Sequence, residues 1–127
     1  MQRQVMWLFL MAMVLMPALV VAVTAADFEV KTTQNLLNLC TASPNDPYYR
    51  EAIHFCQGYL VGAYHYYLSV TGDDASKALV CLPTPSPSRN EAVGMFIAWA
   101  QAHSEYWNER PVETQFRFLT EKWPCQH

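Results

Sequence analysis

The sequence carries little charge and has no excess of basic residues. Lys and Arg number 8 against 11 Asp and Glu, which gives a formal net charge of −3 at pH 7. Proteins that bind nucleic acid through phosphate contacts concentrate Lys and Arg on one surface. The composition therefore argues against a nucleic-acid partner.

Recognisable catalytic and metal-binding motifs are also missing. The sequence has no G-x-S-x-G elbow, no H-E-x-x-H helix, no glycine-rich phosphate loop and no C-x-x-C pair. The histidines form no recognisable constellation; they are His54, His65, His103 and His127. We therefore expect no catalytic residue, no metal ligand and no cofactor, and a protein that is not an enzyme.

Alternation of polar and apolar residues, the sign of a β-strand, is nearly absent, whereas helical spacing recurs. We expect a first short helix capped by Thr33, with Leu36, Leu37 and Cys40 on one face. A second helix should begin at Asp46 and Pro47, because a capping carboxylate accepts free N–H groups and proline suits the first helical position. It should run to about Val70, with Gly72 as its C-terminal stop.

Proline marks the boundary between the second and third helices. Pro83, Pro85 and Pro87 predict a stiff, extended loop, after which Ser88 and Glu91 form a capping box. We expect core positions at Val93, Phe96, Ile97, Ala100 and Trp107 for the third helix, and at Val112, Phe116, Leu119 and Trp123 for a fourth helix that opens at Pro111.

Gly58 and Gly62 lie one turn apart inside the second helix, where each costs about 1 kcal/mol relative to alanine. We interpret them as the place where a neighbouring helix approaches closely; a partner-binding surface is the alternative. Two adjoining stripes make this the expected central helix: Cys56, Tyr59, Ala63, Tyr66 and Val70 form one, and Ile53, Leu60 and Tyr67 form the other.

Residues 1–26 have the pattern of a secretory signal peptide. One arginine near the start is followed by a nearly continuous apolar run from Val5 to Val23, and small residues precede Asp27. An uncleaved membrane anchor is the competing interpretation. We expect one helical domain over residues 27–127, without a membrane segment once the leader is removed.

The cysteines lie beyond the leader, at Cys40, Cys56, Cys81 and Cys125. An even number in an exported chain favours two disulfides, and the spacing does not fit a zinc site. The chain is thus expected to be a small all-α, four-helix domain stapled by two disulfides.

Several short motifs occur in an order that resembles a known family. They are the segment Leu36–Cys40, Cys56-Gln57-Gly58-Tyr59-Leu60-Val61-Gly62, Cys81-Leu82-Pro83, Ala102-His103-Ser104-Glu105 and Trp123-Pro124-Cys125. Together they are similar to the Rap/Tai family, periplasmic immunity proteins for peptidoglycan amidase toxins delivered by type VI secretion. The resemblance spans nearly the whole mature chain. The sequence departs from the family pattern at Ser104, where a proline is expected, and the proline-rich loop is individual.

The resemblance implies a disulfide-bonded helical domain that inhibits an amidase effector by covering or plugging its active-site groove, often as a homodimer. Three disulfide pairings are possible. An up-and-down helix arrangement favours Cys40 with Cys56 and Cys81 with Cys125, because the first helix then ends beside the start of the second; the other pairings stay open.

Two segments are candidates for partner binding, because a protrusion that is already ordered loses little entropy on association. Thr84–Asn90 contains Pro85 and Ser86 and is anchored by Cys81. His103–Arg110 contains Tyr106, Trp107 and Arg110, residue types that dominate interfaces, although Trp107 has core packing as an alternative role. Tyr64 and His65 on the second helix complete the set.

Three other functions compete with immunity. One is a small periplasmic chaperone that opens in acid, which two disulfides would oppose. Another is an enzyme acting on cell-wall material, for which the sequence offers no acid, base or nucleophile that stands out. The third is an envelope-binding protein that has kept the scaffold without a toxin partner.

Overall fold

The computed structural model describes residues 21–126, and over that range the chain forms four α-helices and three short 3-10 helices. The α-helices are α2 (Thr33–Cys40), α3 (Tyr49–Thr71), α4 (Arg89–Ala102) and α5 (Pro111–Lys122); the 3-10 helices are η1 (Ala25–Glu29), η2 (Ala75–Lys77) and η3 (Ser104–Tyr106). The expected all-α, four-helix class is confirmed. The predicted leader, 1–26, falls mostly on residues 1–20, which lie outside the described range.

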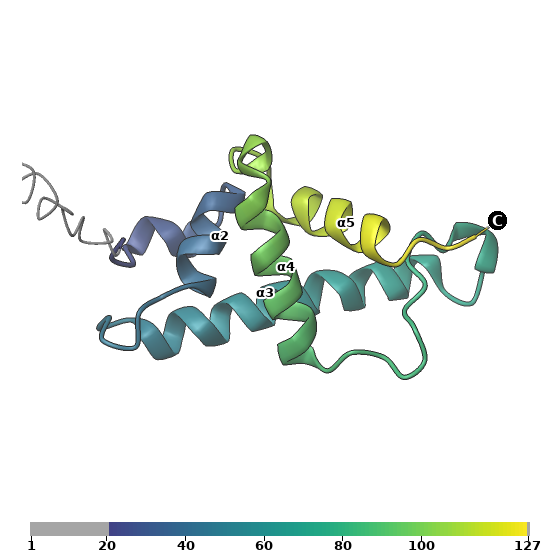
Figure 1. Ribbon diagram of the computed structural model, residues 1–127, viewed down its shortest axis with the longest axis horizontal. Helices are drawn as coiled ribbons and strands as arrows, with labels where there is room; N and C mark the ends of the chain where they lie inside the picture. The colour runs from purple at the N-terminus through teal and green to yellow at the C-terminus, as the bar shows by residue number, and fades with distance from the viewer. Residues whose placement is uncertain (1–20, 127) are drawn as a thin grey trace, which may run out of the picture.

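The helices do not run up and down beside one another. Figure 1 shows α4 lying across α3, while α5 extends along the C-terminal half of α3 and α2 covers the other end. The core lies where these helices meet. Its most deeply buried apolar side chains are Leu36, Leu39, Ala52, Cys56, Phe96 and Ala100.

The first helix is capped one residue earlier than expected. Thr32 is the N-cap of α2: its hydroxyl accepts the N–H of Asn35 at 3.3 Å, and the Asn35 side chain accepts the N–H of Thr32 at 3.2 Å. Thr33 is instead fully buried, with its hydroxyl oxygen 2.6 Å from that of Thr114 in α5. Thr33 therefore joins two helices, a role that its position in the sequence did not reveal.

Asp46 and Pro47 precede α3 rather than open it. The Asp46 carboxylate accepts the N–H of Tyr48 and, through its other oxygen, the N–H of Val23, both at 2.8 Å. The carboxylate is thus used in the turn before the helix, and it also holds the N-terminal segment. The predicted stop is confirmed, since Gly72 follows the helix with φ of 56°.

The expectation for Gly58 and Gly62 was wrong. A side chain added at either position would meet no atom within 4 Å, so no neighbouring helix approaches there. The buried residues of α3 include Cys56, Leu60 and Tyr67, on the opposite side of the helix, and the glycine stripe faces outward. Of the two predicted apolar stripes, the first leaves the core in its second half, where Tyr66 is 71% exposed.

The predicted boundaries of α4 and α5 are confirmed at their N-termini. Ser88 and Glu91 form the capping box of α4, and Pro111 is the first residue of α5. The expected core face of α5 is wrong at Val112, which is exposed. The residues of α5 that turn inward are Pro111, Thr114, Gln115, Phe118 and Leu119. Two of these are polar, which is why apolar periodicity misplaced the face.

Both favoured disulfides are present. Cys40 pairs with Cys56, joining the end of α2 to α3, and Cys81 pairs with Cys125, joining the interhelical loop to the C-terminal segment. Beside the second bridge, Val80 and Pro124 form an isolated antiparallel β-bridge, and the N–H of Cys81 donates to the carbonyl of Trp123 at 2.8 Å. The expected anchoring of the loop by Cys81 is therefore confirmed.

Candidate functional site

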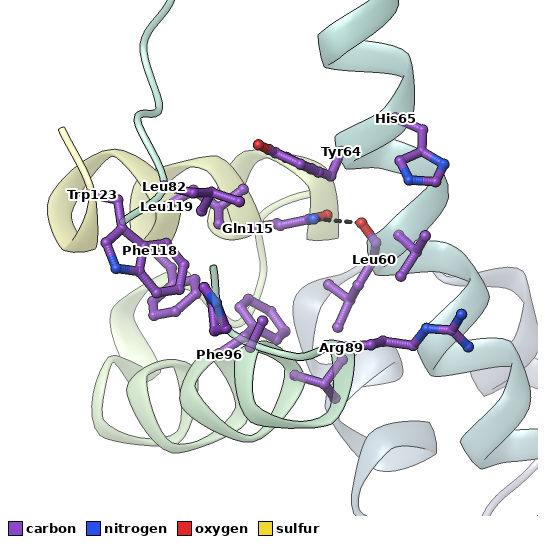
Figure 2. Close-up of a pocket in the computed structure, with 14 residues that line it drawn as sticks. Leu60, Tyr64, His65, Leu82, Arg89, Phe96, Gln115, Phe118, Leu119 and Trp123 are labelled. Carbon is purple, nitrogen blue, oxygen red and sulfur yellow. Dashed lines mark hydrogen bonds between the residues drawn. The ribbon is translucent and has the colours of Figure 1, made fainter. Parts of the chain in front are cut away.

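A pocket of about 310 Å³ lies among α3, α4, α5 and the loop that leads into α4. Figure 2 shows its apolar interior, to which α4 contributes Phe96, α5 contributes Phe118 and Leu119, and the loop contributes Leu82. The volume is at the small end of the range of about 300 to 1,000 Å³ that is typical of ligand pockets. It suits one large side chain or a small molecule.

Four of the residues that line this pocket have polar or ionisable side chains that bear on binding. Tyr64 and His65 belong to α3, Arg89 is the first residue of α4, and Gln115 belongs to α5. In Figure 2 the Arg89 side chain extends from the start of α4 toward α3, on which His65 lies. The structure thus places two candidates from the second helix in the same pocket lining as Arg89, a residue that no sequence pattern had indicated.

The proline-rich loop contributes Pro87 to the pocket lining, but Pro85 and Ser86 are not among the lining residues. Both are exposed, and the Ser86 hydroxyl donates to the carbonyl of Pro83 at 3.3 Å. The peptide bond between Thr84 and Pro85 is cis. Pro85 and Ser86 therefore lie beside the pocket on an exposed part of the loop.

Tyr64 stays a neutral phenol at ordinary pH. Burial, with a smaller contribution from the neighbouring Tyr67, raises the pKa of Tyr64 above its usual value of 10.0. The two rings stack with their centroids 6.0 Å apart. Tyr64 therefore presents a hydroxyl that can donate or accept a hydrogen bond, not a base.

Gln115 fixes α5 against α3. Its side-chain Nε2 donates to the backbone carbonyl of Leu60 at 2.7 Å, while its Oε1 has no hydrogen-bonding partner among the described residues (Figure 2). Gln115 is 4% exposed, so this bond is shielded from water. A buried polar residue on α5 is thus part of the pocket wall, which apolar periodicity cannot predict.

Tyr67 anchors the wall that the loop supplies. Its hydroxyl oxygen accepts the backbone N–H groups of Leu79 and Val80 at 2.7 and 3.1 Å. Tyr67 is buried, and the centroid of its ring lies 5.1 Å from the centroid of the Phe116 ring. Together with the disulfide at Cys81, this tyrosine holds the beginning of the loop against α3 and α5.

The second candidate segment, 103–110, is largely occupied by structural contacts. The indole N–H of Trp107 donates to the carbonyl of Ala100 at 2.8 Å, and the ring packs against the core, which confirms the alternative role considered for Trp107. Arg110 is exposed and pairs with Glu113. Tyr106 lies under the guanidinium of Arg117, whose Cζ is 4.7 Å from the ring centroid.

This segment also caps α2 through its backbone. The carbonyl of Glu109 accepts the N–H of Thr33 at 2.7 Å, and that of Trp107 accepts the N–H of Gln34 at 3.0 Å. The first N–H groups of a helix have no partner within the helix, so these carbonyls satisfy two of them. Because any residue type offers a carbonyl, the sequence carried no signal for this contact.

The pocket does not bring together the groups of a hydrolytic site. Its ionisable lining residues are Tyr64, His65 and Arg89, with no carboxylate or thiol among the described residues that form it. Within residues 21–126, no group of three His, Cys, Asp or Glu side chains is arranged to hold a metal ion. The apolar pocket with its few polar groups is suited to binding.

None of the helices within residues 21–126 has the length and the apolar character that a membrane-spanning segment needs.

Comparison with models of known protein families gives a match. The family model described as Rap1a immunity proteins matches residues 32–125, which include all four α-helices and both disulfides. No curated protein and no solved structure matched the chain. Since the match covers most of the sequence, the chain belongs to the Rap1a immunity protein family.

Proposed function

We propose that this protein is a periplasmic immunity protein that binds a peptidoglycan amidase delivered by type VI secretion and inhibits it without catalysis. The observation that carries the proposal is the family match over residues 32–125, which makes the chain an immunity protein for a secreted effector. The amidase as target is the finer part of the proposal and rests on the motif resemblance.

The periplasm as location is supported by two features. The paired cysteines need an oxidising compartment, and the bacterial periplasm is one. The sequence of residues 1–26 supports export followed by cleavage before Asp27. Intact-mass measurement of the protein from a periplasmic fraction tests both points: a chain beginning at Asp27 with no free thiol is expected, and a cytoplasmic, reduced, full-length chain would contradict them.

Inhibition is tested with the amidase encoded nearest to this protein. Purified mature protein is added to the amidase in increasing molar ratio while hydrolysis of peptidoglycan cross-links is followed. Activity should fall in proportion and reach its minimum near one chain per enzyme, or two chains if a homodimer binds. Neither complex nor inhibition would instead favour an envelope-binding role on the same scaffold.

Binding by the turn at 103–110 is tested separately. Arg110 pairs with Glu113 at the surface, where an ion pair contributes little to stability. Arg110→Ala should therefore change the free energy of unfolding by no more than about 0.5 kcal/mol, as for most surface substitutions. If it also leaves amidase affinity unchanged, the turn is only structural, and the surface around the pocket remains as the binding region.

A further inference from the structure

We propose that the pocket among α3, α4 and α5 receives one large apolar side chain of the effector, and that Arg89 at its mouth binds a carboxylate beside that side chain. This inference rests on the proposed function, because it assigns the contact through which the effector is held. It commits to an effector segment in which an apolar residue and an acidic residue are neighbours.

The size and lining of the pocket favour a single anchoring side chain. Its volume is about 310 Å³ and its interior is formed by residues such as Phe96, Phe118 and Leu119. Apolar or aromatic side chains that enter such pockets provide a large share of the affinity of protein interfaces. The space is too small for a folded segment, so one residue enters and its neighbours remain at the mouth.

The charge at the mouth favours an acidic neighbour. Arg89 is exposed and has no ion-pair partner among the described residues, whereas Arg110 and Arg117 pair with Glu113 and Glu109. The nearest carboxylate in sequence, that of Glu91, is turned back to accept the N–H of Ser88 at 2.8 Å. An effector carboxylate would therefore find a guanidinium with its hydrogen-bond donors free.

The position of Arg89 in α4 strengthens this argument. It is the first residue of the helix, where the helix dipole disfavours a positive charge and favours a negative one. The arginine does not stabilise the helix there, and its guanidinium makes no hydrogen bond within the described protein that would offset this. A role in binding an anion accounts for a cation at that place.

The pocket is held in its shape before any partner arrives. The loop wall that carries Leu82 is tied to α3 through Tyr67 and to the C-terminal segment through Cys81 and Cys125. A site that is already ordered loses less entropy on association. The pocket, including the wall that the loop supplies, is thus already formed in the free protein.

The first test fills the pocket from within. Ala92 lines it, so Ala92→Phe places a ring in the space that the effector side chain would occupy. The matched control is Ala98→Phe on the same helix, at an exposed position that is not part of the lining. Affinity for the amidase, measured by calorimetry, should fall at least about 30-fold for Ala92→Phe, as for removal of an interface hot spot, and stay near the wild-type value for Ala98→Phe.

The second test reverses the charge without endangering the fold. Arg89→Glu places a carboxylate in the first turn of α4, so thermal stability should be kept or slightly raised while amidase affinity falls. Arg50→Glu is the matched control, because Arg50 is also exposed in the first turn of a helix, α3, and lies outside the pocket. Weaker binding by Arg89→Glu alone, with a smaller dependence of affinity on salt, is the expected result.

The outcomes separate this inference from the proposed function. If wild-type protein binds the amidase and Ala92→Phe or Arg89→Glu binds equally well, the pocket does not bind the effector in the proposed way, and the immunity function stands. If wild-type protein does not bind the amidase, both are wrong. If Ala92→Phe changes the oligomeric state of the protein, measured as its molar mass in solution, but not its amidase affinity, the pocket is a contact between copies of this chain. The proposed binding of an effector side chain is then wrong.

Discussion

Replacing Tyr67 by phenylalanine removes one oxygen atom and tests how the loop wall of the pocket is held. In the wild-type protein that oxygen accepts two backbone N–H groups, from Leu79 at 2.7 Å and from Val80 at 3.1 Å. The ring itself packs against Phe116, and phenylalanine keeps this contact. The substitution therefore isolates the two hydrogen bonds.

The expected loss follows from the burial of the two donors. Val80 is 6% exposed, so without the Tyr67 oxygen its N–H is left in the interior without a partner. A buried donor that loses its partner costs about 1 to 3 kcal/mol, whereas a donor that water can reach costs less. Leu79 is 57% exposed and belongs to the second case. We expect Tyr67→Phe to lower the free energy of unfolding by about 1 to 3 kcal/mol, most of it from Val80.

Urea unfolding of the oxidised protein measures this difference, and amide hydrogen exchange locates it. Exchange should accelerate at Leu79 and Val80 more than in α2. Tyr66→Phe is the matched control, because Tyr66 is the adjacent tyrosine, is 71% exposed, and has no hydrogen bond from its hydroxyl within the described residues. It should change the free energy of unfolding by less than about 0.5 kcal/mol. Equal stability of the two variants would refute the anchoring role of Tyr67.

Three further predictions concern the disulfides, an exposed glycine and a buried carboxylate. Replacing both cysteines of a bridge by alanine should lower the free energy of unfolding, measured in urea, by about 3 kcal/mol for Cys40 and Cys56, which are 16 residues apart, and by about 4 kcal/mol for Cys81 and Cys125, which are 44 residues apart. The second loss is larger because a bridge that closes a longer loop restricts the unfolded chain more, and the reverse order would contradict this reasoning. Gly62→Ala should stabilise the protein by about 0.5 to 1 kcal/mol, because nothing lies within 4 Å of the added methyl group, and a lower melting temperature would revive the predicted close approach. Although burial opposes ionisation of Asp27, hydrogen bonds from Thr24, Asn38 and Asn35 outweigh it and hold the pKa of its carboxyl below the usual 3.8. The prediction applies to a chain that retains Thr24, whose backbone N–H makes the largest of these contributions. The contribution of Asp27 to stability is thus full above about pH 4 and lost as the pH falls through the lowered pKa, so Asp27→Asn should flatten the acid limb of a stability–pH curve; an unchanged limb would show that other groups set it.

Local chemistry made much of the fold predictable. The capping box at Ser88, the proline at the start of α5 and the glycine after α3 each act within a few residues, and each prediction is confirmed. The pairing of Cys40 with Cys56 was favoured because α2 ends close to where α3 begins, and this holds although α4 lies across α3 instead of beside it.

Predictions failed where a residue's role depends on a distant part of the chain. Thr33 looked like a cap but bonds to Thr114, and Asp46 looked like a cap but also binds the N–H of Val23. Gly58 and Gly62 looked like a packing site because the sequence does not say which side of α3 the other helices cover. Such roles depend on helix packing, which periodicity within one helix does not contain.

The sequence by itself determined the helical class, the use of its four cysteines in disulfides and the motifs of the Rap1a immunity family, because these depend on residue identity and short spacing. Tertiary structure alone decided that Tyr64, His65 and Arg89 line one apolar pocket, while Trp107 packs against the core. The physical reason is that a pocket exists only where α3, α4, α5 and their loop come together, and the backbone and buried polar contacts that set those positions join residues far apart in the sequence.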